Sequence, residues 1–392
     1  MNTVTSPEAL EPILFSPPSI GDAEAGEVMA VLQSGWLTTG PRVERFEREF
    51  AAYVGARYAL AVNSCTAALH LSLLAAGIGP GDEVVTTPLT FCATANAIVH
   101  TGATPVFADV DPVTMNLTPA SAAAAVTSRT RAVLPVHFAG RPVDVPGFRA
   151  LAESRGLVVV DDAAHAVEAS SGPHKVGAVS GDLTCFSFYA TKNLTTAEGG
   201  MVTTNRRDWA ERIRVMSLHG MSRDAWARYS VNGSQRYDVQ MAGFKYNMSD
   251  LQAALGIHQL ASIDDRRHRR EAIWRRYDAG LAGLPLERPA PTRPYDRHAR
   301  HLYTILVDEA ASGWTRDGLA EALRARGVAT AVHFTALHLH SFYAERFGLQ
   351  RGMFPAAEFI SDRTLSLPLS PAMTDGIVDR VIDAVRECMA GR

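Results

Sequence analysis

Cysteine is scarce in this chain of 392 residues, which contains only Cys65, Cys92, Cys185 and Cys388. No two of them have the CxxC spacing of a zinc site or a redox pair. A chain of this length can build its core without disulfides, so the scarcity argues against a disulfide framework and suits a reducing compartment. We therefore expect neither a metal centre nor structural disulfides.

Strong charge and long apolar runs are lacking as well. The chain carries 38 basic and 41 acidic residues, for a net charge of −3, which disfavours a nucleic-acid or membrane partner. The short basic run RRHRR at 266–270 is typical of a solvated helix face. The first residues, MNTVTSPEALEP, lack the pattern of a secretory signal, and no apolar run reaches membrane-spanning length. We expect a soluble, cytoplasmic protein.

From about residue 59 onward, apolar runs of strand length alternate with helical patterns. Several of the runs are almost continuously apolar, which is typical of strands buried on both faces of a mostly parallel sheet. The predicted strands cover 59–64, 83–88, 104–110, 131–138, 156–163, 183–189 and 199–205. The predicted helices cover 66–77, 118–127 and 145–156, and two of them end at a glycine. This alternation predicts an α/β layered domain.

The pattern changes after these elements. Residues 221–243 are polar and aromatic without a clear period, which favours a long loop. Residues 249–284 carry a long helical pattern with a kink or a break, and a proline-rich linker follows at 284–294. The rest of the sequence alternates strand and helix again. We predict a large α/β domain over residues 1–262 and a small C-terminal α+β domain over residues 263–392.

The segment NSCTAAL, residues 63–69, runs from a strand into a helix. The first amides of a helix have no partner inside it and lie at its positive end, so small residues there let an anion approach. Ser64 or Thr66 adds a hydroxyl donor. A simple helix cap explains the same residues without any ligand. The segment therefore indicates a phosphate site only in combination with other signals.

Two further strand ends carry candidate groups. The segment DDAAHA at 161–166 follows a buried strand, and its carboxylates lie where α/β proteins bind ligands. Asp161 or Asp162 is either a helix cap or the partner of a protonated ring nitrogen. His165 either faces the same pocket or packs in the core. Phe91, at another strand end, is a core aromatic or, beside a flat cofactor, a stacking face.

Lys192 follows a further strand, in the stretch FSFYATKNLTTAEGG at 186–200. It is either a surface lysine in a turn or an amine that acts as a nucleophile toward a carbonyl cofactor. The order along the chain favours the second interpretation, because an anion site, an aromatic and an acid precede Ser187 and Lys192 along one edge of one sheet. Pyridoxal phosphate (PLP) needs this set of groups: an anion site, a ring stacker, a pyridinium partner and a Schiff-base lysine.

These motifs resemble the DegT/StrS-type sugar aminotransferases, which are PLP enzymes of fold type I. The resemblance runs from about residue 34 to the C-terminus. Its carriers are NSCTAALHLSLLAAGIGPGDEV (63–84), GATPVFADVDPVTMNL (102–117), DDAAHA, CFSFYATKNLTTAEGG (185–200) and GFKYNMSDLQAALG (243–256). It implies a large domain around a mostly parallel sheet, a small C-terminal α+β domain, and PLP as the cofactor.

Carried over by motif, the resemblance implies a role for each candidate residue. Lys192 is the Schiff-base lysine and Asp162 the pyridinium partner, so these two are the predicted catalytic residues, and Asp161 is a structural neighbour. His333 resembles a small-domain histidine near the sugar. The other implied cofactor contacts are Thr66, the backbone amide of Ala67, Phe91, His165 and the hydroxyl of Ser187.

The GFKYN segment implies a homodimer, because in this family it reaches into the active site of the neighbouring subunit. Many members read GYNYR there, whereas this chain has Lys245 and Asn247. The resemblance leaves open which of the two touches the phosphate in the partner. We assign Asn247 to the cofactor and Lys245 to the substrate.

The reaction implied by the resemblance is transfer of an amino group from L-glutamate to a nucleotide-linked keto-sugar. Some members of the family lack the lysine and act as dehydratases, so Lys192 favours transamination. The KYN- and HFAG-type segments are most similar to the subgroup that makes UDP-4-amino-4-deoxy-L-arabinose. They favour a 4-keto-pentose or a 4-keto-6-deoxyhexose as the substrate.

Other functions were weighed against this one. A 3-keto sugar or a cyclitol ketone stays open as an alternative substrate. A nicotinamide-dependent oxidoreductase would need GxGxxG after the first strand, which NSCTAAL does not supply. A non-catalytic regulatory relative is disfavoured by the complete set of site residues.

Overall fold

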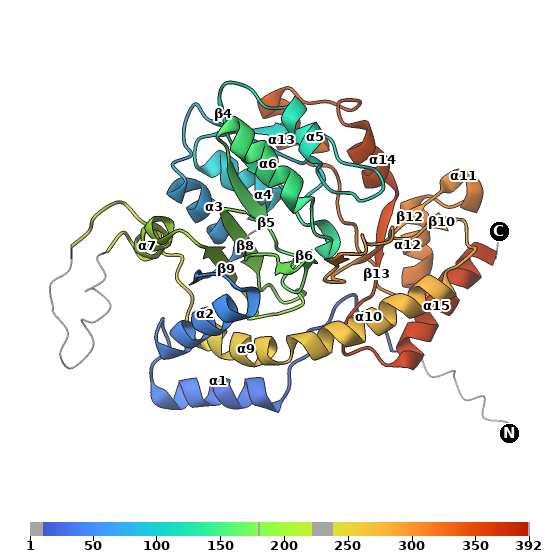
Figure 1. Ribbon diagram of the computed structural model, residues 1–392. Coiled ribbons are helices and arrows are strands. Elements are labelled where there is room, and N and C mark those ends of the chain that lie inside the picture. Colours follow the sequence, from blue (N-terminus) through green and yellow to red (C-terminus); the bar gives the residue numbers. More distant parts are fainter. Residues whose placement is uncertain (1–10, 179–180, 222–237, 391–392) are drawn as a thin grey trace.

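The computed structural model describes residues 11–178, 181–221 and 238–390. Within these residues the central sheet has seven strands in the order β1-β9-β8-β5-β4-β2-β3 (Figure 1). The strands are β1 (Tyr58–Val62), β2 (Glu83–Thr86), β3 (Thr104–Phe107), β4 (Thr130–Leu134), β5 (Val158–Asp162), β8 (Leu183–Ser187) and β9 (Gly200–Thr204). Each predicted strand is confirmed, at a shorter length than the apolar run suggested.

The directions of the strands determine at which edge of the sheet the site lies. β2 pairs in parallel with β3 and β4, β4 with β5, and β5 with β8. β9 pairs antiparallel with both β8 and β1, so β1 runs in the same direction as the parallel set. The predicted mostly parallel sheet is thus confirmed. The carboxyl ends of β5 and β8 meet at one edge of the sheet, which is where parallel sheets bind ligands.

Helices cover both faces of this sheet. On one face α3 (Cys65–Ala75) and α7 (Arg207–Met216) pack against Leu60 and Val62 of β1. On the other face α2 (Pro41–Val54) and α9 (Asp250–Ala261) pack against Ala59 and Ala61. The alternation of side chains along a strand therefore gives two separate cores, one on each side.

The large layered part contains several further elements. The helices are α1 (Asp22–Ser34), α4 (Cys92–His100), α5 (Pro119–Ala124), α6 (Val145–Arg155) and the 3₁₀ turn η1 (Phe138–Gly140). A small antiparallel sheet contains β6 (Ser170–Ser171), β7 (His174–Lys175) and β11 (Asp296–Arg297). The three predicted helices are confirmed as α3, α5 and α6. The last of these ends at Gly156, whose positive φ of 65° suits a glycine.

The long helical pattern predicted over 249–284 is confirmed, and it is broken. α9 ends at Ala261 and α10 (Ile263–Gly280) begins after Ser262. The Ser262 hydroxyl donates to the backbone carbonyl of His258 at 3.0 Å, a local bond of the kind that bends helices. Figure 1 shows the two helices following one another along one side of the molecule.

A second core forms beyond this break. Its sheet is antiparallel and contains β10 (Leu286–Glu287), β12 (Tyr303–Val307) and β13 (Thr364–Leu367). The helices α12 (Arg316–Ala325) and α15 (Asp375–Ala390) pack in this core, and the short α11 (Glu309–Ser312) follows β12. The 3₁₀ turn η2 (Leu337–Leu339) and the helices α13 (Ser341–Phe347) and α14 (Pro355–Arg363) instead pack with Leu89 and Phe107 of the large layered part. Trp274 and Tyr277 of α10 are buried in this core. The division into domains at residue 262 stays a prediction.

The N-terminal segment crosses to the second core. Ile13 is buried there and pairs with Val328. Two residues further on, the ring of Phe15 stacks on His333 with centroids 5.6 Å apart, and the Ser16 hydroxyl donates to the carbonyl of Thr191 at 3.2 Å. Residues near the start of the chain therefore bind both the C-terminal sheet and the loop that carries Lys192.

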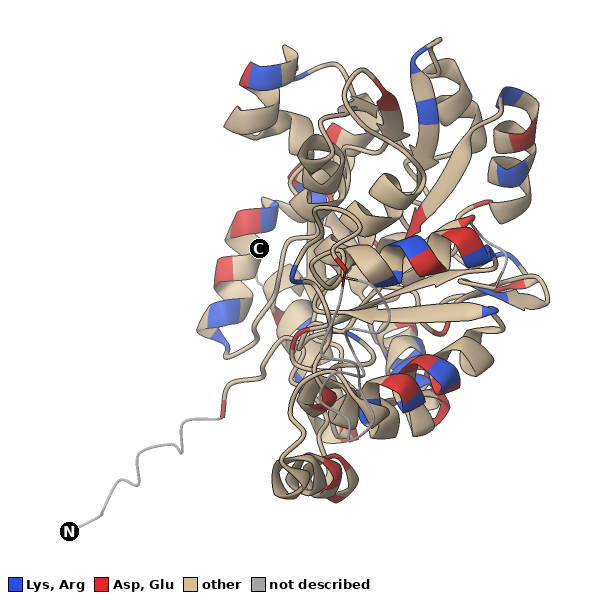
Figure 2. Ribbon diagram, turned by 90° about the vertical axis from the view of Figure 1, so that its left-hand side faces the viewer, with Lys and Arg blue, Asp and Glu red and all other residues tan. Residues whose placement is uncertain are grey.

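Two expectations about surfaces can be compared with the fold. Figure 2 shows basic and acidic residues interspersed over the outer helices. Across the described ranges, none of the helices combines the length and the apolar character that crossing a bilayer requires. The loop predicted over 221–243 falls mostly outside the described residues.

Candidate active site

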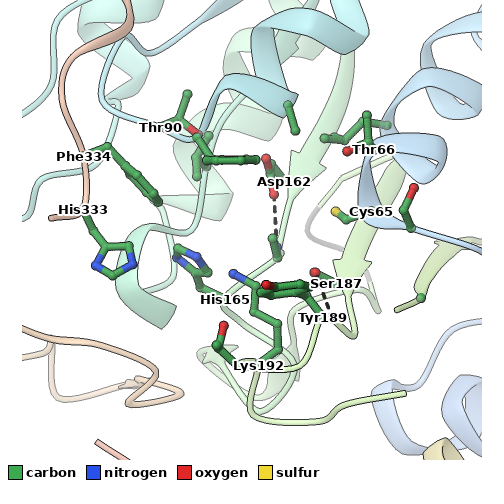
Figure 3. A pocket seen from close by; sticks show the side chains of 18 of the residues that line it. Cys65, Thr66, Thr90, Asp162, His165, Ser187, Tyr189, Lys192, His333 and Phe334 are labelled. Atoms are coloured by element: carbon green, nitrogen blue, oxygen red, sulfur yellow. Dashed lines mark hydrogen bonds between the residues drawn. The ribbon is translucent and has the colours of Figure 1, made fainter. Parts of the chain in front are cut away.

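A cavity of about 330 Å³ opens at the carboxyl edge of the central sheet. Eight residues singled out from the sequence line it: Ser64, Thr66, Phe91, Asp162, His165, Ser187, Lys192 and His333. Figure 3 shows Lys192 reaching toward the space between His165 and Ser187, with His333 on one side and Thr66 on the other. The fold thus gathers side chains from four strand ends and from the C-terminal part of the chain.

Asp162 is the last residue of β5 and is buried. Its Oδ2 accepts a hydrogen bond from the Thr94 hydroxyl of α4 at 2.8 Å, and its Oδ1 accepts one from the backbone amide of Ala164 at 3.1 Å. Burial raises the pKa of the carboxyl group, while these hydrogen bonds and the charge of Lys192 act to lower it. Both oxygens of a carboxylate at this position are therefore held in place by donors.

Asp161 points to the opposite side of β5. Its Oδ2 accepts a hydrogen bond from the Thr184 hydroxyl at 3.3 Å, and its Oδ1 lies 3.6 Å from Nε2 of the buried His137. Asp161 does not line the cavity. Because successive residues of a strand face opposite sides, only one of the two adjacent acids reaches the site.

Lys192 lies in the loop between β8 and β9, where its backbone amide donates to the carbonyl of Tyr189 at 2.9 Å. Burial lowers the pKa of its amine from 10.5 to about 8, although Cys65 and Asp162 act to raise it. A larger fraction of this amine is uncharged near neutral pH than in an exposed lysine. An uncharged amine is the form that attacks a carbonyl.

The amino end of α3 faces the same cavity through Ser64, Cys65 and Thr66. The Ser64 hydroxyl caps the helix by accepting from the amide of Ala67 at 3.1 Å. Ala67 does not itself line the cavity. β9 passes close to this turn, since a Cβ added at Gly200 would lie 2.5 Å from the Ser64 carbonyl. The positive end of an 11-residue helix thus meets the hydroxyl of Thr66 at one wall.

His165 is held between two rings. Its imidazole stacks on Phe334 at 6.1 Å and lies 4.5 Å from the ring of His301. Burial, together with nearby Lys192, lowers its pKa well below the usual value, so the ring is neutral at physiological pH. Its Nδ1 is buried and has no hydrogen-bond partner among the described residues. A buried polar atom of this kind at a cavity wall indicates a place for a ligand atom.

His333 and Phe91 contribute the remaining predicted walls. Nδ1 of His333 lies 2.8 Å from the hydroxyl of Ser366, and burial lowers the pKa of this histidine to about 3. Phe91 is 60% exposed, so a large part of its ring is free to contact a ligand. A core aromatic would not leave that much apolar surface in water.

Lys245 and Asn247 lie outside this cavity. The side-chain amide of Asn247 donates to the Thr39 hydroxyl at 2.7 Å, and its backbone bridges Val62 at the end of β1. Lys245 is exposed. The roles assigned to them in a partner's site stay predictions.

Four residues that line the cavity or contact its predicted residues were missed in the sequence: Thr90, Thr94, His301 and Phe334. The hydroxyls of Thr90 and Thr94 lie 2.8 Å apart, and the second of them holds Asp162. Thr90 lies just before Phe91, the N-cap of α4, and Thr94 lies in the first turn of that helix. His301 and Phe334 come from the C-terminal part and carry no local pattern that marks them.

Comparison with protein families identifies the family of this chain. The model of the DegT/DnrJ/EryC1/StrS aminotransferase family matches residues 18–386. This chain belongs to that family. It is therefore a sugar aminotransferase, and the fold expected for such PLP enzymes is the one observed.

This DegT/DnrJ/EryC1/StrS family member is also similar to individual proteins over most of its length. It is 53% identical over 378 residues to the spore coat polysaccharide biosynthesis protein SpsC of Bacillus subtilis (strain 168), covering 96% of this chain and 97% of SpsC. Among solved structures, a candidate sugar aminotransferase of Streptococcus pneumoniae, Spr1654, in its PLP-form is 32% identical with a TM-score of 0.90, covering 97% of this chain and 99% of that one. A PMP-form of Spr1654 is also similar.

DesI, solved in the presence of its TDP-sugar product, is 34% identical with a TM-score of 0.86. The match covers 97% of this chain and 94% of DesI. The family resemblance predicted from the sequence motifs is thereby confirmed over nearly the whole chain.

Proposed function

We propose that this aminotransferase binds PLP in the cavity described above and transfers the amino group of L-glutamate to the 4-keto group of a nucleotide-linked sugar. The observation that carries the proposal is the meeting of three groups in one cavity: the amine of Lys192, the carboxylate of Asp162 and the amino end of α3. These are the groups that the aldehyde, the ring nitrogen and the phosphate of PLP require.

The cavity offers donors of the kinds that the cofactor needs. The phosphate would be held by the amides at the start of α3 and by the hydroxyls of Thr66 and Ser187, which line the cavity. The exposed ring of Phe91 offers a stacking face, and the unpartnered Nδ1 of His165 offers a hydrogen bond to a ring substituent. When bound, PLP supplies an aldehyde that takes up the amino group and a ring that accepts the electrons of the adjacent carbon.

Two side chains would carry the protons. Lys192, with a pKa of about 8, would hold the aldehyde carbon and, once displaced by the donor, move a proton to and from the amino-bearing carbon. Asp162 would keep a proton on the ring nitrogen, and the hydrogen bonds from Thr94 and Ala164 favour the anionic carboxylate that this requires. His165 stays neutral and adds no charge to the site.

Support for the substrate class comes from the relatives. DesI was solved with a TDP-sugar product, and SpsC is a polysaccharide biosynthesis protein. The 4-keto position, and the pentose or 6-deoxyhexose, are favoured by the resemblance of the KYN- and HFAG-type segments of this chain to those of one subgroup of the family. Initial rates with matched nucleotide-linked 4-keto and 3-keto sugars and a cyclitol ketone test the choice. The 4-keto sugar should react fastest, and a faster 3-keto sugar or cyclitol would contradict the assignment.

The cofactor and the donor can be tested together. Wild-type protein loaded with PLP should show a visible absorption band that disappears on adding L-glutamate, whereas Lys192→Ala should show no covalent band and no turnover. Lys175→Ala is the matched control, because burial also lowers the pKa of that amine to about 8, yet Lys175 packs on Tyr53 outside the cavity. Wild-type protein that takes up no PLP would overturn the cofactor. A band that does not change on adding L-glutamate would contradict only the choice of amino donor.

We extend the proposal to a homodimer with shared sites, which would give Lys245 and Asn247 a ligand although they lie outside their own chain's cavity. A Lys192→Ala chain and a chain with Lys245→Met and Asn247→Ala should each be inactive alone. Mixed and reassociated, they form a heterodimer in which one site has its lysine from one chain and its two contacts from the other, so activity should return. A mixture of folded, dimeric chains that stays inactive would rule out sharing.

A further inference from the structure

Asn193, the residue after the lysine, joins three separate parts of the chain. Its side-chain Nδ2 donates to Oε2 of Glu168 and to the backbone carbonyl of Ala299, both at 2.9 Å. Its Oδ1 lies 3.0 Å from Nδ1 of His301. Glu168 follows β5, and residues 299–301 lead into β12 of the C-terminal sheet. One side chain therefore ties the lysine loop to the segment that carries Asp162 and to the second core.

We propose that Asn193 is a positioning residue that holds the Lys192 loop at the cavity wall and, through His301, orients His165. The proposal rests on the role given above to Lys192, and it adds a residue to which neither the motifs nor the comparisons assign a task. This role follows from the hydrogen-bond partners of the side-chain amide of Asn193.

The first step is that the amide has only one acceptable orientation. The two partners of Nδ2, a carboxylate oxygen and a peptide carbonyl, are acceptors only. A flipped amide would turn its oxygen toward both of them and lose both hydrogen bonds. Oδ1 must therefore face His301.

The second step fixes the tautomer of His301. An oxygen that faces its Nδ1 requires a proton on that nitrogen. Burial and nearby cations lower the pKa of this histidine well below the usual value, so the ring carries one proton only. His301 is thus neutral, with Nδ1–H as the donor and Nε2 as the acceptor.

The position of His301 affects the cavity through the neighbouring ring of His165. The ring of His301 lies 4.5 Å from the ring of His165, and Phe334 stacks on His165 as well. A fixed His301 therefore limits the tilt of His165, which lines the cavity. Tight packing transmits position in this way because buried rings have little free volume.

Glu168 is anchored from behind, which makes the arrangement rigid. It is fully buried and pairs with the guanidinium of Arg270 on α10, which is 1% exposed. Removing either charge would leave the other buried without a partner and damage the fold. Asn193 is neutral, so it is the member of the network whose replacement is informative.

The test measures the Lys192 amine directly, on the full chain freed of cofactor, so that it does not depend on PLP chemistry. The chain has three lysines, Lys175, Lys192 and Lys245, and a labelled peptide map separates them. In the wild type, labelling of Lys192 by an amine reagent should have its pH midpoint at about 8. In Asn193→Ala the loop loosens, water reaches the amine, and the midpoint should rise by about one pH unit.

Asn116→Ala is the matched control. Asn116 is also largely buried, and its side chain donates to the carbonyl of Arg141 and accepts from the amide of Phe138, but it does not line the cavity. Its loss should lower thermal stability and leave the Lys192 midpoint unchanged. Asn193→Asp keeps the shape but replaces the donor with an acceptor, so it should behave like Asn193→Ala.

The outcomes separate this proposal from the proposed function. A folded Asn193→Ala chain with the wild-type midpoint, or an Asn193→Asp chain that behaves as wild type, would overturn the positioning role. If Asn193→Ala does not fold, the imidazole ¹⁵N shifts of His301 in the wild type decide, assigned by their loss in His301→Gln. A protonated Nδ1 supports the role, and a protonated Nε2 contradicts it. A shifted midpoint in a protein that binds no PLP would leave the role standing and refute the cofactor.

Discussion

The two acids at the end of β5 have the same side chain and different surroundings. Asp162 faces the cavity with donors on both oxygens, whereas Asp161 faces Thr184 and His137 on the other side of the strand. Burial raises the pKa of Asp162, whereas its hydrogen-bond donors and the charge of Lys192 act to lower it. The chemical difference between the two residues therefore comes from their position on the strand.

This difference predicts the outcome of a paired substitution. In the proposed function the charge of Asp162 supports a proton on the ring nitrogen, so Asp162→Asn should lower kcat by about 10²–10³-fold while the chain still folds. Asp161→Asn should leave kcat near the wild-type value, because Asp161 does not line the cavity. Steady-state rates with melting curves for both variants provide the check. Equal losses of kcat in the two variants would contradict the assignment.

Lys192, Asp162 and Thr66 could be predicted from the sequence because each follows a strand and belongs to a recognisable local pattern. Thr94, in the first turn of α4, has no local pattern that marks it, because its partner Thr90 lies outside the helix. The contacts of Asn193 could not be predicted either, since its carbonyl partner at Ala299 is 106 residues away and is brought close only by tertiary packing. Local patterns therefore identify residues that line the cavity better than residues that hold them in place.

At the scale of elements, the predicted strands were too long for a physical reason. The run at 131–138 continues for four residues past the end of β4 at Leu134, and those residues are still buried. Apolar sequence marks burial, and burial continues from the ladder into the loops that surround the cavity. The antiparallel direction of β9 could not be predicted either, since a buried strand has the same composition in both directions.

The cap of α3 gives a prediction at this scale. Ser64→Ala removes the hydroxyl that accepts from Ala67, so the free energy of unfolding should fall by about 1 kcal/mol in a denaturant titration. Ser249→Ala is the control, because Ser249 caps α9 in the same way and does not line the cavity. Both variants should lose similar stability, and only Ser64→Ala should also bind PLP more weakly. Equal PLP affinity in the two variants would separate the start of α3 from phosphate binding.

At the scale of the whole molecule, several buried histidines set how stability depends on pH. Burial lowers the pKa of His165, His298 and His301 well below 6.5, and lowers that of His333 to about 3. Between these values and 6.5 the unfolded chain binds more protons than the folded one, so stability rises with pH across this window. Burial also raises the pKa of three carboxyl groups, those of Glu47, Asp162 and Asp250, and these act with the opposite sign.

The expected result is a melting temperature that falls as the pH is lowered from 6.5 toward 4. His333→Gln should make this dependence less steep, because it removes one group that resists protonation in the folded state. His174→Gln, at an exposed position, should leave the slope unchanged. Melting curves at a series of pH values check the prediction, and an unchanged slope in His333→Gln would contradict it.

The attachment of the N-terminal segment has a consequence for the order of assembly during synthesis. The hydroxyl of Ser370 donates to the carbonyl of Pro17 across 353 residues of sequence, and the amide of Ile13 donates to the carbonyl of Gly327. A ribosome makes residues 13–17 early and the β13 region much later, while the strands between them can already pair as they emerge. The early segment therefore has no docking place until the late one has been made. The stacking of Phe15 on His333, which lines the cavity, therefore forms as one of the final steps of folding, after the central sheet.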